Sequence, residues 1–274
     1  MFFIIFKMKI FDGKKAAAEI INELSRKISK EKIAPKLAII SVSPDKASKL
    51  YMRNKKRAAR QAGIKISSFN FSAAASENAI IKKIEHLNRD DSVHGIIVQL
   101  PLPKRFNTDK IISKISSQKD VDGFKEDSLL APVLPSAIFF CLKKAGVGGG
   151  KKILALVNSK LFGEVLKSFL KGKGLKMEYA LLAEIPIEKM KKADVLILVC
   201  GCPGFIKDDM IKDGAVIIDA GITMKGKKVL GDMDKESAKG KASFFTPVPG
   251  GVGPLTVALL LKNVYLAYGN SKNN

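Results

Sequence analysis

Hydrophobic positions follow two different spacings that alternate along the first half of the chain. Some stretches repeat apolar residues every three or four positions, as helices do, and others are unbroken apolar runs of strand length. The expected helices span 14–29, 46–62 and 77–87, and the expected strands span 36–42, 64–71 and 93–99. Gly63 follows the second helix, where a C-terminal glycine is favoured. Strands that alternate with helices predict a parallel sheet built from βαβ units.

The second half repeats this alternation after a loop-rich stretch over 120–135. The expected strands span 152–157, 175–180, 193–199 and 215–219, and the expected helices span 137–144, 161–171, 187–192 and the apolar stretch after Pro254. Gly146–Gly150 is expected to be a hinge. We therefore predict an α/β fold of two lobes. The first domain comprises residues 1–145 plus 251–274, because the last helix packs back on it, and residues 146–250 form a Rossmann-like domain.

Composition excludes several classes of protein. With 274 residues, 46% of them hydrophobic, the chain can build sizeable cores and is not expected to be disordered. Its net charge of +22, from 48 basic and 26 acidic residues, comes from lysines scattered over every predicted helix, and it has no Trp. We therefore expect that the protein does not bind nucleic acid. A basic nucleic-acid-binding protein is the alternative if the chain is not an enzyme. The lysines are interpreted as a solvated surface, or as an attraction for an anionic substrate.

Cysteine content and the apolar start of the chain predict the compartment. Three cysteines provide no disulfide framework, and Cys200-Gly-Cys202 lacks the spacing and the second pair that a metal site needs, so we predict no metal. Residues 1–6 are apolar but too few to span a bilayer, and they lack the features of a signal peptide. Met8 begins a stretch that resembles an ordinary start. We expect a cytoplasmic protein with no membrane partner.

Three polar residues in the first half of the chain are candidates for a shared site. Tyr51 and Lys55 lie four positions apart on a predicted helix and so share a face, where a ring can desolvate the amine and lower its pKa. Gln99 follows a predicted parallel strand, at the end where α/β proteins bind ligands, and its amide can orient the lysine. The structural alternatives are a surface lysine beside a tyrosine, and a polar residue before a Pro-rich turn.

Two further segments are unusual in composition. Lys119-Asp-Val-Asp-Gly-Phe124 contains an ordinary turn signal, but a carboxylate there is also the natural partner of the 2-amino-4-oxopyrimidine edge of a pterin. Thr246–Pro254 is rich in proline and glycine, which suits a rigid loop that holds a ligand or a turn between lobes. The glycines at 146–150 do not form a phosphate-binding loop, because they precede a predicted strand and do not match the required spacing.

Together these segments closely resemble the bifunctional methylenetetrahydrofolate dehydrogenase/methenyltetrahydrofolate cyclohydrolase family. The matching segments occur in the family's order over nearly the whole chain: Tyr51-Met-Arg-Asn-Lys55, Val93–Pro103, Lys119–Phe124, Gly214–Ile222, Gly231-Asp232 and Thr246–Pro254. The resemblance implies a catalytic folate domain and an NAD(P)-binding domain, with the active site in the cleft, and a homodimer. It implies oxidation of 5,10-methylenetetrahydrofolate with NADP, followed by hydrolysis of the methenyl product to 10-formyltetrahydrofolate.

The resemblance also implies roles for individual residues. Lys55 resembles the family's catalytic lysine, which handles protons during hydrolysis, and Gln99 the residue that positions it. Tyr51 resembles the ring that stacks on the folate, and Asp122 the pterin-binding carboxylate. The expected substrate-binding residues are Tyr51, Gln99, Leu100, Asp122, Pro249, Gly250 and Gly251, and the expected cofactor-binding residues are Val157, Asn158, Ser159, Lys160 and Ile222. The expected partner is a tetrahydrofolate derivative, whose polyglutamate tail would account for an attraction to lysines.

The chain departs from the family at the nucleotide site. Where the family has G-R-S-x-I-V-G-x-P, residues 157–165 read V-N-S-K-L-F-G-E-V, and no arginine follows Arg105. Only arginine offers a planar fork to a phosphate, although Lys160 can supply a charge. NADP is expected, while NAD stays open, with Glu178 as the nearest candidate for its ribose-binding carboxylate. Weak nucleotide binding with mainly cyclohydrolase activity, and a folate-binding scaffold without turnover, are the remaining alternatives.

Overall fold

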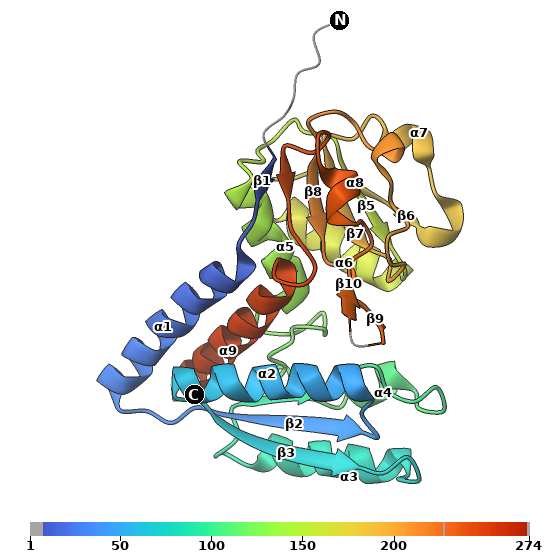
Figure 1. Ribbon diagram of the computed structural model, residues 1–274. Coiled ribbons are helices and arrows are strands. Elements are labelled where there is room, and N and C mark those ends of the chain that lie inside the picture. The colour runs from blue at the N-terminus through green and yellow to red at the C-terminus, as the bar shows by residue number, and fades with distance from the viewer. Residues whose placement is uncertain (1–7, 227, 273–274) are drawn as a thin grey trace, which may run out of the picture. The chain divides into compact units, whose positions relative to one another are not determined.

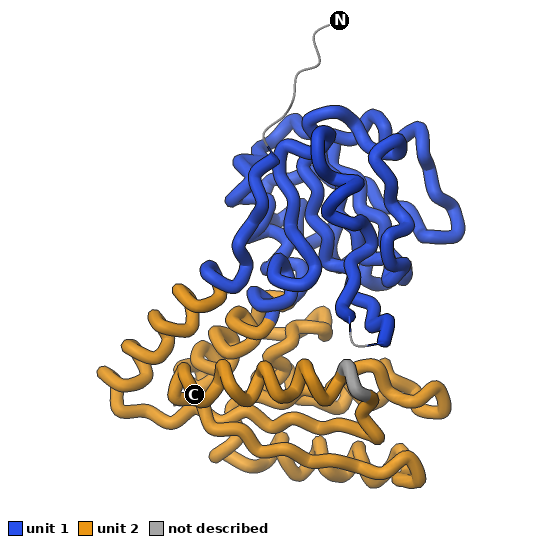
Figure 2. The backbone as a smooth tube through the Cα atoms, viewed as in Figure 1, with its two compact units in different colours: residues 1–16, 134–256 blue, residues 17–133, 257–274 orange. Residues whose placement is uncertain are grey.

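The chain forms two compact units in a computed structural model that describes residues 8–226 and 228–272. The expectation about the first seven residues therefore lies outside the described part. Unit 1 comprises residues 1–16 and 134–256, and unit 2 comprises residues 17–133 and 257–274 (Figure 2). Each unit is thus assembled from two separate stretches of the chain.

Unit 2 is built on a three-stranded parallel sheet with helices on both faces (Figure 1). Its strands, in the order β3-β2-β4, are β2 (Lys36–Val42), β3 (Lys65–Phe71) and β4 (Gly95–Val98). Its helices, wholly or in their larger part, are α1 (Gly13–Glu31), α2 (Lys46–Ala62), α3 (Glu77–Arg89), α4 (Thr108–Ile112) and α9 (Val252–Asn270). Alternate residues of β2 point to opposite faces, so Leu37 and Ile39 pack with α2, whereas Ile40 and Val42 pack with α3.

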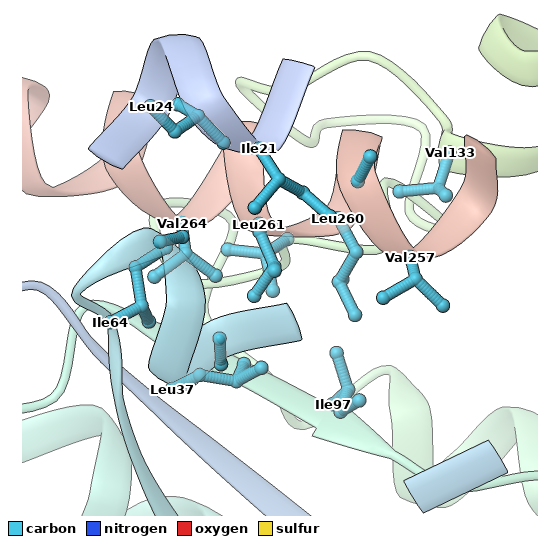
Figure 3. Packing of buried hydrophobic residues seen from close by; sticks show 14 of the residues in the cluster. Ile21, Leu24, Leu37, Ile64, Ile97, Val133, Val257, Leu260, Leu261 and Val264 are labelled. Atoms are coloured by element: carbon cyan, nitrogen blue, oxygen red, sulfur yellow. The ribbon is translucent and has the colours of Figure 1, made fainter. Parts of the chain in front are cut away.

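The last helix supplies a large part of the core of unit 2. Val257, Leu260, Leu261 and Val264 of α9 pack among buried side chains of α1, α2 and β2 (Figure 3). The prediction that the C-terminal helix packs back on the first lobe is confirmed. Among the described residues, α9 is also the one helix long and apolar enough to cross a membrane by length and composition, but half of it is buried inside the protein. Such a helix is explained by the core it completes.

Unit 1 contains a six-stranded parallel sheet in the order β1-β11-β8-β7-β5-β6. Its strands are β1 (Lys9–Ile10), β5 (Ile153–Val157), β6 (Met177–Leu181), β7 (Val195–Val199), β8 (Val216–Asp219) and β11 (Phe244–Phe245), with a separate hairpin of β9 (Thr223–Lys225) and β10 (Lys228–Leu230). Its helices are α5 (Val133–Lys144), α6 (Lys160–Lys171), α7 (Ile187–Met190) and α8 (Lys235–Ala238), with 3-10 turns η1 (Leu182–Glu184) and η2 (Asp208–Met210).

The order of strands in unit 1 creates a topological switch point. The chain runs from β5 outward to β6 and then returns to β7 on the other side of β5. Crossovers therefore leave β5 and β7 in opposite directions, and the carboxyl ends at such a switch point are the usual ligand site of an open α/β sheet. The predicted α/β fold with a Rossmann-like second domain is confirmed by this arrangement.

The division into units differs from the expected domain boundary near residue 145. Strand β1 joins the sheet of unit 1 by pairing with β11, and Phe140 of α5 contacts Phe11 beside that strand, with ring centroids 6.3 Å apart. Both the start of the chain and α5 therefore belong to unit 1. The glycines at 146–150, expected as a hinge between domains, instead connect α5 to β5 within one unit.

Candidate active site

Two elements of unit 2 bring Lys55 and Gln99 together. Asp45 caps the start of α2 by accepting from the Ser48 N–H at 2.7 Å, so the helix begins at a defined position beside the sheet. Gln99 follows β4 directly, and its N–H continues the sheet by donating to the Ile40 carbonyl at 2.8 Å. The Lys55 Nζ donates to the Gln99 Oε1 at 3.0 Å. The predicted contact between lysine and amide is present in this geometry.

The amide of Gln99 is held so that its oxygen faces the lysine. Its Nε2 donates to the Leu100 carbonyl at 2.7 Å, which leaves Oε1 as the acceptor for Lys55. Burial lowers the pKa of Lys55 from its usual value near 10.5, and the charge of Asp122 opposes part of this change. A neutral amide partner stabilises the ammonium less than a carboxylate would. Lys55 is therefore an amine that releases its proton more readily than an exposed lysine does.

The two aspartates of the D-V-D segment have different surroundings. Asp120 is buried and accepts from the N–H groups of Gly123 and Lys125 at 3.1 and 3.0 Å, so it stabilises the turn. Asp122 instead interacts electrostatically with Lys55, and burial raises the pKa of its carboxyl against the lowering effect of the lysine. The geometry thus distinguishes a structural aspartate from one that shares the lysine's site.

The segment that carries Asp122 is fixed from both sides. The Asp122 carbonyl accepts from the Val133 N–H at 3.0 Å. The Asn263 Nδ2, on α9, donates to the Val121 and Ala131 carbonyls at 2.9 Å each. Gly123 has a left-handed φ of 69°, and a Cβ there would lie 2.7 Å from the Pro132 Cα. The last helix therefore holds the loop that presents the carboxylate.

Tyr51 lies one helical turn before Lys55 on α2 and is half-buried. Burial raises the pKa of its phenol, so the ring stays neutral over the physiological range. A neutral aromatic ring next to a partly desolvated amine is suited to contact a flat heterocycle. Tyr51, Lys55, Gln99, Leu100 and Asp122 all belong to unit 2.

The Pro- and Gly-rich loop before α9 belongs to unit 1 and is locked by its own backbone. The Gly251 N–H donates to the Pro247 carbonyl at 2.7 Å, and the Gly13 N–H donates to the Gly250 carbonyl at 2.9 Å. A Cβ on Gly251 would lie 2.7 Å from the Pro247 oxygen, so no larger residue fits there. Gly250, with a φ of 111°, needs the conformational freedom of glycine. This loop, which carries Pro249, is therefore rigid.

The predicted cofactor residues lie at the carboxyl edge of the sheet in unit 1. Val157 ends β5, Asn158 follows it, and Ser159 caps α6 by accepting from the Phe162 N–H at 3.4 Å. Lys160 is the first residue of α6, so a cation stands at the helix N-terminus that faces the switch point. A helix start with a lysine in its first turn fits a phosphate group. Ile222, after β8, is 38% exposed.

Gly163 allows α6 to approach the sheet closely. A Cβ on Gly163 would lie only 2.6 Å from the ring of Tyr179 on β6. The Tyr179 hydroxyl donates to the Glu164 carboxylate at 2.6 Å, which fixes the ring over the helix. The loop departs from the expected family pattern at five positions, but it keeps the glycine that close helix–strand packing in dinucleotide folds requires.

Two domain families match the chain, one before α5 and one from the start of α5 onward. Residues 11–122 match the catalytic domain of tetrahydrofolate dehydrogenase/cyclohydrolase, and residues 132–272 match its NAD(P)-binding domain. The chain belongs to the tetrahydrofolate dehydrogenase/cyclohydrolase family. A curated relative, the bifunctional protein FolD of Moorella thermoacetica, is 41% identical over 271 residues, which cover 93% of this chain and 96% of the relative. The FolD protein of Campylobacter hominis is 37% identical with 93% and 95% coverage.

Solved structures of the family share the fold. The FolD crystal structure from Campylobacter jejuni has a TM-score of 0.89 at 33% identity, covering 96% of this chain and 99% of that one. The Trypanosoma brucei enzyme, solved with NADP cofactor and inhibitor, has a TM-score of 0.89 at 27% identity, covering 97% and 99%. The family's dehydrogenase/cyclohydrolase fold therefore extends over essentially the whole chain.

Glu178, which the sequence suggested as a partner of the nucleotide ribose, lies at the amino end of its strand. Glu178 is the second residue of β6, and its carboxylate pairs with the Lys189 Nζ at 3.0 Å. It lines a pocket with Lys151 and Lys176 at the amino ends of the strands. Nucleotides bind such sheets at the carboxyl ends, so Glu178 is not a ribose partner.

Sequence reasoning missed a pair of buried carboxylates in the family's NAD(P)-binding domain. Asp219 ends β8 with no exposed surface, and Asp232 is 1% exposed. Each accepts main-chain hydrogen bonds from loops at the carboxyl edge of the sheet. The sequence signal that could have found them is a charged residue directly after an apolar strand, together with Gly231-Asp232.

Proposed function

We propose that this protein oxidises 5,10-methylenetetrahydrofolate to 5,10-methenyltetrahydrofolate with NADP and hydrolyses the product to 10-formyltetrahydrofolate. Membership of the dehydrogenase/cyclohydrolase family supports this proposal. The observation that carries it is the hydrogen bond of 3.0 Å between Lys55 and Gln99, in a site that also holds Asp122. An amine with a lowered pKa, an amide and a carboxylate are the groups that this chemistry needs.

We assign Lys55 the proton transfers of the hydrolysis. Water adds to the methenyl carbon and loses a proton, and the carbon–nitrogen bond then breaks as the departing ring nitrogen gains one. Lys55, whose burial lowers its pKa, can accept the first proton as a free amine and return it as an ammonium. Gln99 holds the Lys55 Nζ through its Oε1 without adding a negative charge. We therefore assign Gln99 a positioning role.

We assign Asp122 and Tyr51 to recognition of the substrate. A carboxylate matches the paired N–H donors of the pterin 2-amino-4-oxo edge, and the charge of Lys55 opposes part of the rise in the Asp122 pKa that burial causes. The neutral ring of Tyr51 is suited to stack on the flat substrate. Leu100, Pro249, Gly250 and Gly251 complete the proposed substrate contacts, the last three on a loop locked by its own hydrogen bonds.

The proposed nucleotide site is the carboxyl edge of β5 and its neighbours. NADP, when bound, would supply the acceptor for the hydride that leaves the methylene carbon. Asn158, Ser159 and Lys160 would hold its phosphates at the start of α6, with Val157 and Ile222 as apolar contacts. This assignment places the proposed nucleotide contacts in unit 1. NAD stays an alternative, because the cation here is Lys160. A lysine lacks the planar fork with which an arginine binds a phosphate, such as the extra phosphate of NADP.

A paired assay of both reactions tests this function. The purified protein is expected to reduce NADP when methylenetetrahydrofolate is present and to hydrolyse added methenyltetrahydrofolate, with NAD tested beside NADP. The absence of any NADP or NAD reduction at millimolar nucleotide would overturn the dehydrogenase half, while absent hydrolysis would overturn the role of Lys55.

We also expect the protein to be a cytoplasmic homodimer that binds neither nucleic acid nor membranes. Light scattering measures the molar mass in solution, and the mass of a single chain would contradict the expected dimer.

A further inference from the structure

The loop after β7 is anchored by a buried carboxylate from a distant segment. The Asp232 Oδ2 accepts from the Cys200 N–H at 2.7 Å, and its Oδ1 accepts from the Cys202 N–H at 2.7 Å. Asp232 is 1% exposed. Burying a charge is costly unless hydrogen bonds replace the lost water, and bonds to a carboxylate are among the stronger ones in proteins. Both oxygens are thus used on the main chain of one short loop.

A second buried carboxylate anchors the segment that carries Asp232. The Asp219 carboxylate accepts from the N–H groups of Asp232 and Met233 at 3.3 and 3.0 Å. It also accepts from the Gly221 N–H at 3.0 Å, directly before Ile222. Asp219 itself ends β8, so its position follows from the sheet. The sheet therefore fixes Asp219, Asp219 fixes Asp232, and Asp232 fixes the loop after β7.

Two glycines make room for these carboxylates. A Cβ on Gly221 would lie 2.1 Å from the Asp232 Oδ2, and a Cβ on Gly231 would lie 2.3 Å from the Asp219 Oδ2. Gly221 does not have a left-handed φ. Its φ therefore permits alanine, and the nearest atoms that a side chain there would meet are those of the Asp232 carboxylate.

The anchored loop borders the switch point of the sheet. Residues 200–202 follow β7, which lies next to β5 on the side opposite β6. The Asn158 N–H, after β5, donates to the Val199 carbonyl at 3.2 Å, so the two loops meet there. A ligand at this crevice contacts both loops.

From this arrangement we propose that Asp232 is a positioning residue for nucleotide binding. It holds the loop at 200–202 in the shape that contacts the dinucleotide. The inference rests on the proposed dehydrogenase function and extends it to a residue that touches no substrate. Hydrolysis of the methenyl bridge, which needs no nucleotide, does not depend on Asp232.

The test is Asp232→Asn with NADP binding and hydrolysis measured separately. The amide keeps one acceptor but turns an NH₂ towards one of the two loop N–H groups. We expect the dissociation constant for NADP, followed by titration calorimetry, to rise roughly ten- to hundredfold, because one loop N–H loses its acceptor and the loop is no longer held in place. The kcat for methenyltetrahydrofolate hydrolysis should stay near that of the wild type. Asp209→Asn, an exposed aspartate of the same unit, is the matched control.

A second variant keeps the inference testable if Asp232→Asn does not fold. Gly221→Ala leaves Asp232 in the chain but places a methyl group against its carboxylate, so it should also weaken NADP binding and spare hydrolysis. A folded Asp232→Asn that binds NADP like the wild type would overturn the inference, as would equal loss of binding and hydrolysis in both variants. A wild type that binds neither NADP nor NAD would instead overturn the proposed dehydrogenase function, and this inference with it.

Discussion

Lys55 is hydrogen-bonded to an amide, although a carboxylate is available in the same site. The distance from its Nζ to the Gln99 Oε1 is 3.0 Å, whereas Asp122 acts on it through charge. Burial lowers the pKa of Lys55 and Asp122 raises it in part. A direct carboxylate partner in place of Gln99 would hold the lysine more firmly in its charged form. The amide thus orients the amine and still permits it to release a proton.

Replacing this amine should stop one reaction and leave the fold unchanged. Lys55→Met retains the length and apolar stem of the side chain, so packing on α2 is preserved. We expect hydrolysis of methenyltetrahydrofolate to fall by about 10² to 10⁴, the usual contribution of a positioned acid–base group. Stopped-flow absorbance would follow the reaction, with the exposed neighbour Lys56→Met as control. Near-normal hydrolysis by Lys55→Met would remove the lysine from its assigned role.

The sequence indicated the polar site residues of unit 2, but it did not indicate the buried carboxylates Asp219 and Asp232 of unit 1. Tyr51, Lys55 and Gln99 stand at a helical repeat and a strand end, which local patterns can indicate. Asp232 could not be assigned in the same way, because its partners Cys200 and Cys202 lie 32 and 30 positions earlier in the chain. Glu178 was a wrong candidate, since spacing along the sequence cannot say which end of β6 it occupies.

At the scale of elements, α9 stabilises the loop that presents Asp122 through one side chain. Asn263→Leu keeps a similar volume but leaves the Val121 and Ala131 carbonyls without their donor. Each buried polar group left unpaired costs roughly 1–3 kcal/mol, so we expect the free energy of unfolding to fall by about that amount or more. Urea unfolding measures it. Asn270→Leu, at the exposed end of the same helix, should change stability little, and an equal effect in both would contradict this account.

Long periodic elements were predicted well from the sequence, and short ones were not. The strand over 36–42 and the helix over 46–62 match β2 and α2 to the residue. Strands β1 and β11 were missed because each has only two residues, too few for a period, and they exist only through pairing. The domain boundary depends on that same pairing. Tertiary contacts rather than local pattern decide such elements.

At the scale of the whole molecule, the buried pair should make stability depend on pH. Burial, and the charge of Asp232 nearby, raise the pKa of Asp219 from 3.8 to about 7. The folded state then holds the proton more tightly than the unfolded state, so this group's ionisation reduces stability as pH rises from about 4 to 7. Above the pKa of Asp219 in the folded state, its ionisation causes no further loss of stability.

Thermal unfolding at several pH values tests this linkage. The wild type should lose more stability between pH 5 and 7 than Asp219→Asn, whose amide does not ionise. The carboxylates with lowered pKa values, such as Asp194 and Asp234, act in the opposite direction and mainly at more acidic pH. Parallel curves for the two proteins over this range would show that Asp219 does not titrate there.

Because the core of unit 2 needs residues from both ends of its sequence, synthesis order constrains how the protein folds. The apolar faces of α1, α2 and β2 leave the ribosome before Val257–Val264, which cover them and lie about 200 residues further along the chain. During translation those faces lack their partner, and a nascent chain with exposed apolar surface is a substrate for chaperones. Unit 2 therefore becomes native only after residues 257–264 have left the ribosome, whereas most of unit 1 is available to fold before them.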